Sequence, residues 1–364
     1  MARFPHLPLF VAASLLAGGT GCGAKFSHGV KVHYFLYMAA VSQQTLGAFE
    51  INPSTGAFVR QTWSVTTQNT NPDKLEASRD GRFLWMAPIV NPPTVDTYAL
   101  NPATGEPAFA SSLNLGSGIV QEVRASVDQR FLFVSIPLVG IRTLRVLSDD
   151  GSLTASSLNP TIFFNSGSTI RGFGHPEGKY FFLNRAETAE TYLYGVDAAS
   201  GVTTFLQGYS GGGALFQGEG DYVLRSTSNV VYTYTIDRNT GGFVLAGSAG
   251  GLSAGARGID PSGQYLWQAT TGTGLVEVFR LDSHGVVQTP AVASVTVSSL
   301  GSAASIYFLP DGQTALIYDS TNKGLFSFRF DPTAGVLTFV QADLGVHGAG
   351  VGRFIVVKTT EPVS

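Results

Sequence analysis

The sequence contains little of what many proteins of its size have in abundance. Charged residues make up 13% of its 364 residues, against roughly 25% in an average soluble protein. The net charge of −3 leaves no excess of basic residues, so nucleic acid is not an expected partner. Hydrophobic residues nevertheless reach 44%. This excludes a disordered chain, because disorder combines low hydrophobicity with high charge.

Cysteine occurs once, at Cys22, which excludes an intramolecular disulfide, so stability has to come from a packed core. Before it stand one early basic residue, Arg3, then an apolar run from Leu7 to Ala17, then small residues. That order is typical of an export signal, and the run is too short to span a bilayer. The position of Cys22 resembles the lipidation site of bacterial lipoproteins, although Gly19 departs from the usual pattern.

We therefore predict a signal peptide over 1–21 and Cys22 as the lipidated N-terminus of an envelope protein, in the periplasm or at the cell surface. Ordinary secretion and an uncleaved anchor remain alternatives. After this segment no apolar run is long enough to cross a membrane, so membrane contact is expected only through the lipid, on an otherwise monomeric protein.

Several motifs that carry chemistry are also missing. The chain has no Gly-x-Ser-x-Gly elbow, no His-Glu-x-x-His helix and no phosphate-binding loop. Its six histidines do not cluster at metal-ligand spacing, and its aspartates do not form a calcium loop. We expect no metal and no cofactor.

What the chain does have is a repeated phrase, seen as "FEINPSTGAFVRQ" from Phe49 and "FRFDPTAGVLTFVQ" from Phe328. It consists of a β-rich run, Asp or Asn, a short turn with glycine, and a second β-rich run. Asp and Asn start such turns by bonding their own backbone, and glycine adopts the positive φ that the turn needs. The seven copies have their turn glycines at Gly56, Gly105, Gly151, Gly201, Gly241, Gly285 and Gly335.

Between successive copies lies a second pair of strand-like runs, such as "LEASRDGRFLWMAP" over 75–88. Two hairpins per period of 40 to 50 residues make a four-stranded unit, the signature of a β-propeller blade. A sandwich would not repeat its turn chemistry in this way. We predict an all-β, seven-bladed β-propeller over 32–358, preceded by a linker over 22–31 and followed by a tail over 359–364.

The two ends predict how the ring closes. The chain begins with a lone strand over 32–40 and ends with another over 350–358. If the last strand occupies the innermost position of the first blade, the ring closes without exposed strand edges. The first and last copies of the phrase then belong to neighbouring blades.

The turns "INPSTG", "NPATG" and "FDPTAG", the stretch "HPEGKYFFLN" over 175–184 and the closing strand together resemble the lactonase-type seven-bladed propellers. That family includes 6-phosphogluconolactonases and a fungal muconate-cycloisomerising enzyme. The resemblance covers nearly all of the chain after the leader. It implies a histidine just ahead of an innermost strand, and a glutamate after the Asn that ends the next strand. This sequence has Arg171 where the histidine is expected. The residue directly after Asn184 is Arg185, and a glutamate follows only at Glu187.

Propellers bind ligands where the innermost strands converge at the mouth of the channel. In this chain the residues at those positions are Lys74, Glu76, Glu122, Arg124, Arg171, Arg257 and Ser305. Guanidinium groups bind carboxylate or phosphate bidentately, so Arg124, Arg171 and Arg257, with Lys74, are the candidate ligand-binding residues for a small anion. Glu122, Arg171 and Glu187 are the candidate catalytic residues, with Glu122 as a general base. The alternative is that these charges are solvated or pair with one another.

Three functions follow as hypotheses. The first is an exported lactonase-like propeller lipoprotein that binds a small anionic ligand or an envelope protein at the channel mouth. The second is a lactone hydrolase, a carboxylic ester hydrolase with a substrate other than a cytosolic sugar phosphate. The third is a structural or assembly module of the cell envelope. The sequence leaves open whether the protein is an enzyme.

Overall fold

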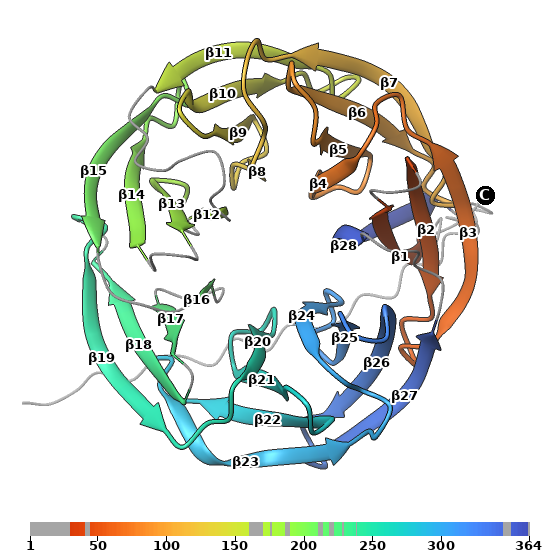
Figure 1. Ribbon diagram of the computed structural model, residues 1–364, viewed down its shortest axis with the longest axis vertical. Coiled ribbons are helices and arrows are strands. Elements are labelled where there is room, and N and C mark those ends of the chain that lie inside the picture. The colour runs from red at the N-terminus through yellow and green to blue at the C-terminus, as the bar shows by residue number, and fades with distance from the viewer. Residues whose placement is uncertain are drawn as a thin grey trace, which may run out of the picture.

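The repeated hairpin pairs fold into blades arranged around one axis in the computed structural model (Figure 1). The structure describes residues 30–40, 44–159, 170–174, 177–185, 190–209, 214–217, 222–227, 229–237, 239–344 and 351–362. These residues form seven antiparallel four-stranded sheets and no helix. The prediction of an all-β, seven-bladed propeller is confirmed.

In each of the first four blades, the strands are named here in order from the innermost to the outermost. Blade 1 has β28 (Val351–Pro362), β1 (Val30–Ala40), β2 (Thr45–Ile51) and β3 (Phe58–Thr66). Blade 2 has β4 (Pro72–Ala77), β5 (Phe83–Pro88), β6 (Thr94–Leu100) and β7 (Pro107–Asn114). Blade 3 has β8 (Glu122–Ala125), β9 (Phe131–Ile136), β10 (Gly140–Val146) and β11 (Leu153–Asn159). Blade 4 has β12 (Ile170–Gly174), β13 (Tyr180–Arg185), β14 (Glu190–Val196) and β15 (Thr203–Tyr209).

The remaining three blades repeat this order. Blade 5 has β16 (Ala214–Gln217), β17 (Tyr222–Ser226), β18 (Val230–Ile236) and β19 (Phe243–Gly250). Blade 6 has β20 (Gly255–Ile259), β21 (Tyr265–Thr270), β22 (Leu275–Leu281) and β23 (Val287–Thr296). Blade 7 has β24 (Ala303–Phe308), β25 (Thr314–Asp319), β26 (Gly324–Asp331) and β27 (Val336–Leu344).

The ring closes through the two terminal strands, as the sequence predicts. β28 pairs antiparallel with β1, in a register that runs from Val30 opposite Pro362 to Ala40 opposite Val351. The two strands extend a few residues beyond the expected propeller limits of 32 and 358. Blades 7 and 1 are also joined by side chains, because Ser327 Oγ donates to the Gly56 carbonyl at 2.5 Å. The first and last copies of the repeated phrase are therefore neighbours.

The second strand of each blade lies between two neighbouring blades, so both of its faces are largely covered. All six residues of β5 are buried. Trp85 packs toward blade 3, whereas Leu84 and Met86 pack toward blade 1. Seven hydrophobic clusters result, one at each interface between blades. Each fully buried aromatic or aliphatic side chain contributes about 1.5–3 kcal/mol, so the contacts between blades stabilise the ring.

The repeated turn has the geometry that its residues predict. In the first copy, Asn52 Oδ1 accepts the N–H groups of Ser54 and Thr55 at 2.9 and 3.1 Å. Gly56 then adopts a φ of +74°. The other six turn glycines have φ between +66° and +76°, the left-handed region that glycine enters without steric cost.

A second requirement for glycine comes from the neighbouring blade. An added Cβ on Gly151 would lie 2.4 Å from Cγ of Phe83, because the turn of blade 3 packs against the aromatic ring that begins β5. The Gly151 carbonyl also accepts the indole N–H of Trp85 at 3.0 Å. The turn glycine therefore allows two blades to approach closely.

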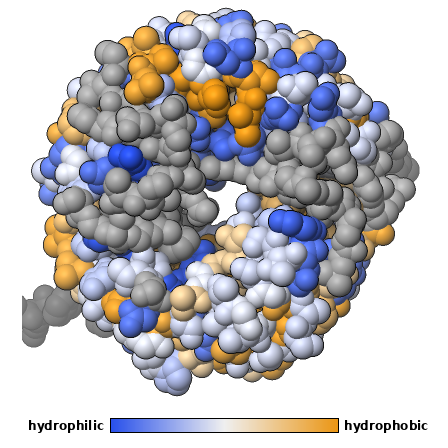
Figure 2. All heavy atoms as spheres, viewed as in Figure 1, coloured by the Kyte–Doolittle hydropathy of each residue, from blue (hydrophilic) through white to orange (hydrophobic). Residues whose placement is uncertain are grey.

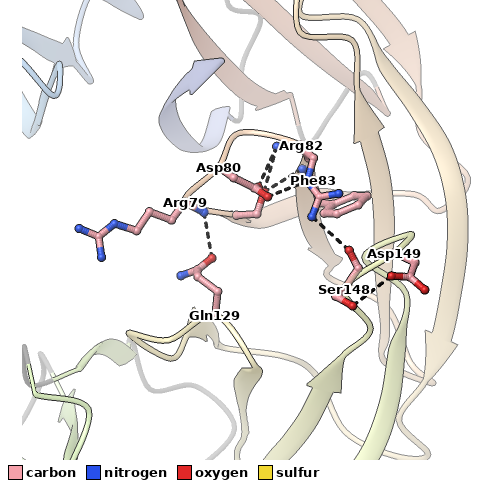
Figure 3. Close-up of polar contacts among 8 residues, drawn as sticks. Arg79, Asp80, Arg82, Phe83, Gln129, Ser148 and Asp149 are labelled. Atoms are coloured by element: carbon pink, nitrogen blue, oxygen red, sulfur yellow. Dashed lines mark hydrogen bonds and ion pairs between the residues drawn. The ribbon is translucent and has the colours of Figure 1, made fainter. Parts of the chain in front are cut away.

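A polar contact on the turn side of blades 2 and 3 reinforces this packing (Figure 3). Arg82 donates from Nε to Asp80 at 2.6 Å and from Nη2 to the Ser148 carbonyl at 3.1 Å. Its guanidinium lies over the Phe83 ring, 5.0 Å from the centroid. Arg130 repeats the arrangement one blade later, bonding Asp128 and a carbonyl of blade 4. The sequence phrase "S-x-D-x-R-F" thus describes a contact between consecutive blades.

Candidate functional site in the central channel

The innermost strands β28, β4, β8, β12, β16, β20 and β24 surround the axis of the ring (Figure 1). Figure 2 shows an opening at the centre of the molecule, with hydrophilic residues on part of its edge. Side chains from several blades therefore meet at this opening, as expected for a propeller.

A cluster of three charged residues lies on two of these strands. Arg124, on β8, donates from Nη1 to Glu76 Oε2 of β4 at 2.9 Å. Its Nε lies 3.2 Å from Glu122 Oε1 on the same strand. The side chains of Glu122, Glu76 and Arg124 are 1%, 15% and 33% exposed, so Glu122 is enclosed while Arg124 remains accessible. We call these three residues the carboxylate–arginine cluster.

A glycine of blade 4 lies against the cluster. Arg124 Nε donates to the Gly172 carbonyl on β12 at 2.8 Å. A Cβ on Gly172 would lie 3.0 Å from Cγ of Glu122 and 3.2 Å from Cγ of Arg124. β12 can approach the cluster this closely because it has glycine at this position.

The charge state of Arg124 is well defined. Burial disfavours the charged guanidinium, but the charges of Glu122 and Glu76 outweigh that effect and raise the pKa of Arg124 above its usual value. The phenol of Tyr307, on β24, also contributes to raising the pKa of Arg124. Among the described residues, two carboxylates face this one guanidinium.

The structure places Lys74 beside the cluster but pairs it elsewhere. Lys74 lies on β4, two residues before Glu76, and its ammonium contacts the carboxylate of Asp73. Both side chains are mostly buried. The charge of Lys74 is therefore compensated within its own strand.

Arg257 occupies a different environment, between blades 5 and 6. Its Nε donates to Gln268 Oε1 at 2.7 Å, and its Nη1 bonds Ser226 Oγ and the Thr227 carbonyl. Its Nη2 donates to the Ser253 carbonyl at 2.5 Å. The side chain is 4% exposed, and burial lowers its pKa. Arg257 connects loops of two blades.

The structure therefore does not bring all the predicted residues together. Within the described ranges, Arg257 makes no polar contact with Arg124 or Lys74. Arg171 lies on β12, where its backbone pairs with Asn184, and Ser305 lies half-buried on β24. The side chain of Arg171 and all of Glu187 and Cys22 lie outside the described part of the chain, so their roles remain predictions.

The described residues contain no group of three or more His, Cys, Asp or Glu side chains placed to hold a metal ion. No helix among them is long and apolar enough to span a bilayer.

Comparison with solved structures identifies the architecture. A periplasmic gluconolactonase from Pseudomonas aeruginosa aligns with a TM-score of 0.70 over 90% of this chain and 99% of its own, at 16% identity. A putative 6-phosphogluconolactonase from Bacteroides fragilis aligns with a TM-score of 0.70 over 89% and 98%, at 14% identity. The chain has the fold of the 6-phosphogluconolactonase-like propellers.

A protein from Lactobacillus plantarum shares this lactonase-like fold, with a TM-score of 0.72, 14% identity, and coverage of 90% of this chain and 100% of that protein. No protein-family model and no curated protein matches the sequence itself. The similarity lies in the lactonase-like fold, so the function has to be inferred from the residues of the channel.

Proposed function

We propose that this protein binds a small, neutral, oxygen-rich molecule in its central channel, through Arg124 and Glu76. The main support is the geometry of Arg124. Its Nε and Nη1 have protein partners, whereas Nη2 has none among the described residues, and a third of the side chain is exposed. A ligand oxygen can accept a hydrogen bond from that nitrogen, and charged donors make the stronger hydrogen bonds.

The pairing of Arg124 argues for a neutral ligand over an anion. Its guanidinium already bonds Glu76 and the Gly172 carbonyl, so fewer of its N–H groups are left for the bidentate contact that a carboxylate or phosphate would make. Lys74 is paired with Asp73, and Arg257 is enclosed by its own partners. The small anionic ligand suggested by the arginines in the sequence is therefore less favoured than a polyol, sugar or lactone.

Lactone hydrolysis is the second candidate, because the cluster places a carboxylate beside a guanidinium. In such a reaction a water oxygen bonds to the lactone carbonyl carbon and the ring C–O bond breaks. A carboxylate accepts a proton from the water and returns one to the ring oxygen, giving a hydroxy acid. A guanidinium N–H can stabilise the negative charge that develops on the carbonyl oxygen. The gluconolactonase among the similar structures supports the same class.

A single substitution separates the neutral from the anionic ligand. Glu76→Gln keeps the shape of the side chain and removes one negative charge from the cluster. By calorimetry we expect it to weaken binding of gluconolactone about threefold to tenfold and to strengthen binding of gluconate. Glu177→Gln removes a carboxylate that pairs with Lys179 at 3.0 Å in a turn and should change neither affinity.

A pH-stat assay on the same variants tests turnover. If the protein is a hydrolase, Glu76→Gln or Glu122→Gln should reduce kcat by about 10²–10⁴-fold. Binding without acid release would favour a binding protein. If the wild type binds neither gluconolactone nor related polyols, the proposal is wrong and an envelope protein partner or an assembly role becomes the better hypothesis.

We further propose that the protein is exported and anchored by a lipid on Cys22. This rests on the leader "MARFPHLPLFVAASLLAGGTG" that precedes the cysteine. Labelling with radioactive palmitate in a bacterial host should mark the wild type and leave Cys22→Ser unlabelled. Equal labelling of the two proteins would refute lipidation at this residue.

A further inference from the structure

Tyr307 lies on β24, the innermost strand of blade 7, and is not among the residues that the sequence predicts for the site. Its neighbours Ile306 and Phe308 pack against Gly258 of blade 6. Because successive side chains on a strand point to opposite faces, Tyr307 points the other way, toward blade 1. There it packs with the cluster of buried residues between blades 7 and 1.

The ring of Tyr307 is held in a defined orientation. It contacts Phe354 of β28 edge to face, with 5.5 Å between the centroids and 62° between the planes. Phe354 in turn packs against Tyr318 of β25, at 5.0 Å. An aromatic ring fixed in this way loses little conformational entropy when it contacts a ligand.

The hydroxyl of Tyr307 differs from other tyrosine hydroxyls of the ring. Those of Tyr37 and Tyr180 donate to backbone carbonyls of the next blade, at 2.7 and 2.9 Å. The Tyr307 hydroxyl has no hydrogen-bond partner in the described part of the chain, and the residue is half-buried. It is available to a ligand.

The strands connect these groups into one arc. β24 adjoins β28, β28 adjoins β4, and β4 adjoins β8 around the axis (Figure 1). The arc therefore carries the packed rings of Tyr307 and Phe354, and then Glu76 and Arg124. Ligand sites commonly combine an apolar wall with a few placed polar groups.

We propose that Tyr307 forms the aromatic wall of the ligand site and selects a cyclic polyol or lactone over its open-chain counterpart. This inference rests on the proposed function. A sugar or lactone ring presents C–H groups from one face and oxygens from its edge. The C–H groups contact the Tyr307 ring, and the oxygens reach the Tyr307 hydroxyl, Arg124 and Glu76. An open chain cannot present a flat apolar face without losing conformational freedom.

The test compares glucose with sorbitol, and galactose with galactitol, by calorimetry or saturation-transfer NMR. We expect the wild type to prefer each cyclic form by about tenfold. Tyr307→Leu should remove that preference, whereas Tyr307→Phe should retain it with about threefold weaker binding. Tyr265→Leu is the matched control, because Tyr265 is also half-buried and packs edge to face on Phe330, at 5.0 Å, away from the cluster. It should bind as the wild type does.

The outcomes separate this inference from the proposed function. If the wild type binds cyclic and open forms equally, or if Tyr307→Leu retains the preference, the aromatic wall is refuted while channel binding stands. If the wild type binds none of the four compounds, both proposals fail. Tyr307→Phe keeps the ring packed on Phe354, so a loss of preference in this folded variant would also contradict the inference.

Discussion

Replacing Gly151 by alanine tests how the blades are held together. Gly151 has a φ of +68°, and for other residues the left-handed region costs about 1–2 kcal/mol. The new methyl group would also lie 2.4 Å from Cγ of Phe83, well inside van der Waals contact. Phe83 is 7% exposed and packs with Trp85, so its ring cannot move away freely.

The expected magnitude is the sum of these two effects. Overpacking of a core typically costs about 1–3 kcal/mol, so Gly151→Ala should lower the free energy of unfolding by about 2–5 kcal/mol. The matched control is Gly272→Ala. Gly272 has a φ of +78°, but an added Cβ would have no heavy atom within 4 Å. It should lose only the backbone contribution, about 1–2 kcal/mol.

Equilibrium urea unfolding, followed by tryptophan fluorescence, measures both variants. Trp85, one of three tryptophans in the chain, donates to the Gly151 carbonyl, so the emission includes a reporter beside the contact. A double-mutant cycle with Phe83→Leu should show a coupling of about 0.5–3 kcal/mol, because the smaller side chain relieves the overlap. Equal destabilisation by Gly151→Ala and Gly272→Ala, with no coupling to Phe83, would refute the close-approach argument.

Two further predictions concern buried charges. Arg257→Met should destabilise the ring by about 2–4 kcal/mol, because four acceptors lose their donor. Sugar binding by the folded variant should be unchanged. Weaker binding with unchanged stability would instead assign Arg257 to the site. Asp319 and Asp96 are both fully buried, and burial by itself raises the pKa of each carboxyl. At Asp319 four backbone N–H groups outweigh burial and lower the pKa. At Asp96 the pKa stays raised. Asp319 therefore contributes to stability above the usual Asp pKa, and that contribution is lost as pH falls through its lowered pKa. The contribution of Asp96 to stability is instead present at low pH and is lost as pH rises through its raised pKa. In urea titrations at pH 7, Asp319→Asn should lower the free energy of unfolding by about 2 kcal/mol, whereas Asp96→Asn should leave it unchanged or raise it. The opposite order would contradict this assignment.

Much of the architecture could be predicted from the residues because it depends on local chemistry. Asn52 and Gly56 form their turn through contacts within a few residues, and the same pattern occurs seven times. A middle strand such as β5 is apolar throughout because it is covered on both sides. These features repeat with a period, and periods are visible without coordinates.

The candidate site could be predicted only in part. The sequence pointed to Glu122 and Arg124 because they begin an innermost strand. It did not show that Arg124 reaches Glu76 on the neighbouring blade, nor that Arg257, at a comparable place on its own strand, connects two blades instead. Tyr307 gave no signal, since an aromatic residue in an apolar strand usually belongs to a core.

The sequence by itself determined the strands, the turns, the number of blades and the closure of the ring, because each follows from short-range patterns repeated along the chain. Only the tertiary structure decided which charges compensate one another and which donors remain available to a ligand. That outcome depends on how neighbouring blades are rotated against each other and on how far each long side chain reaches across the channel, and neither is encoded in the spacing of residues along one strand.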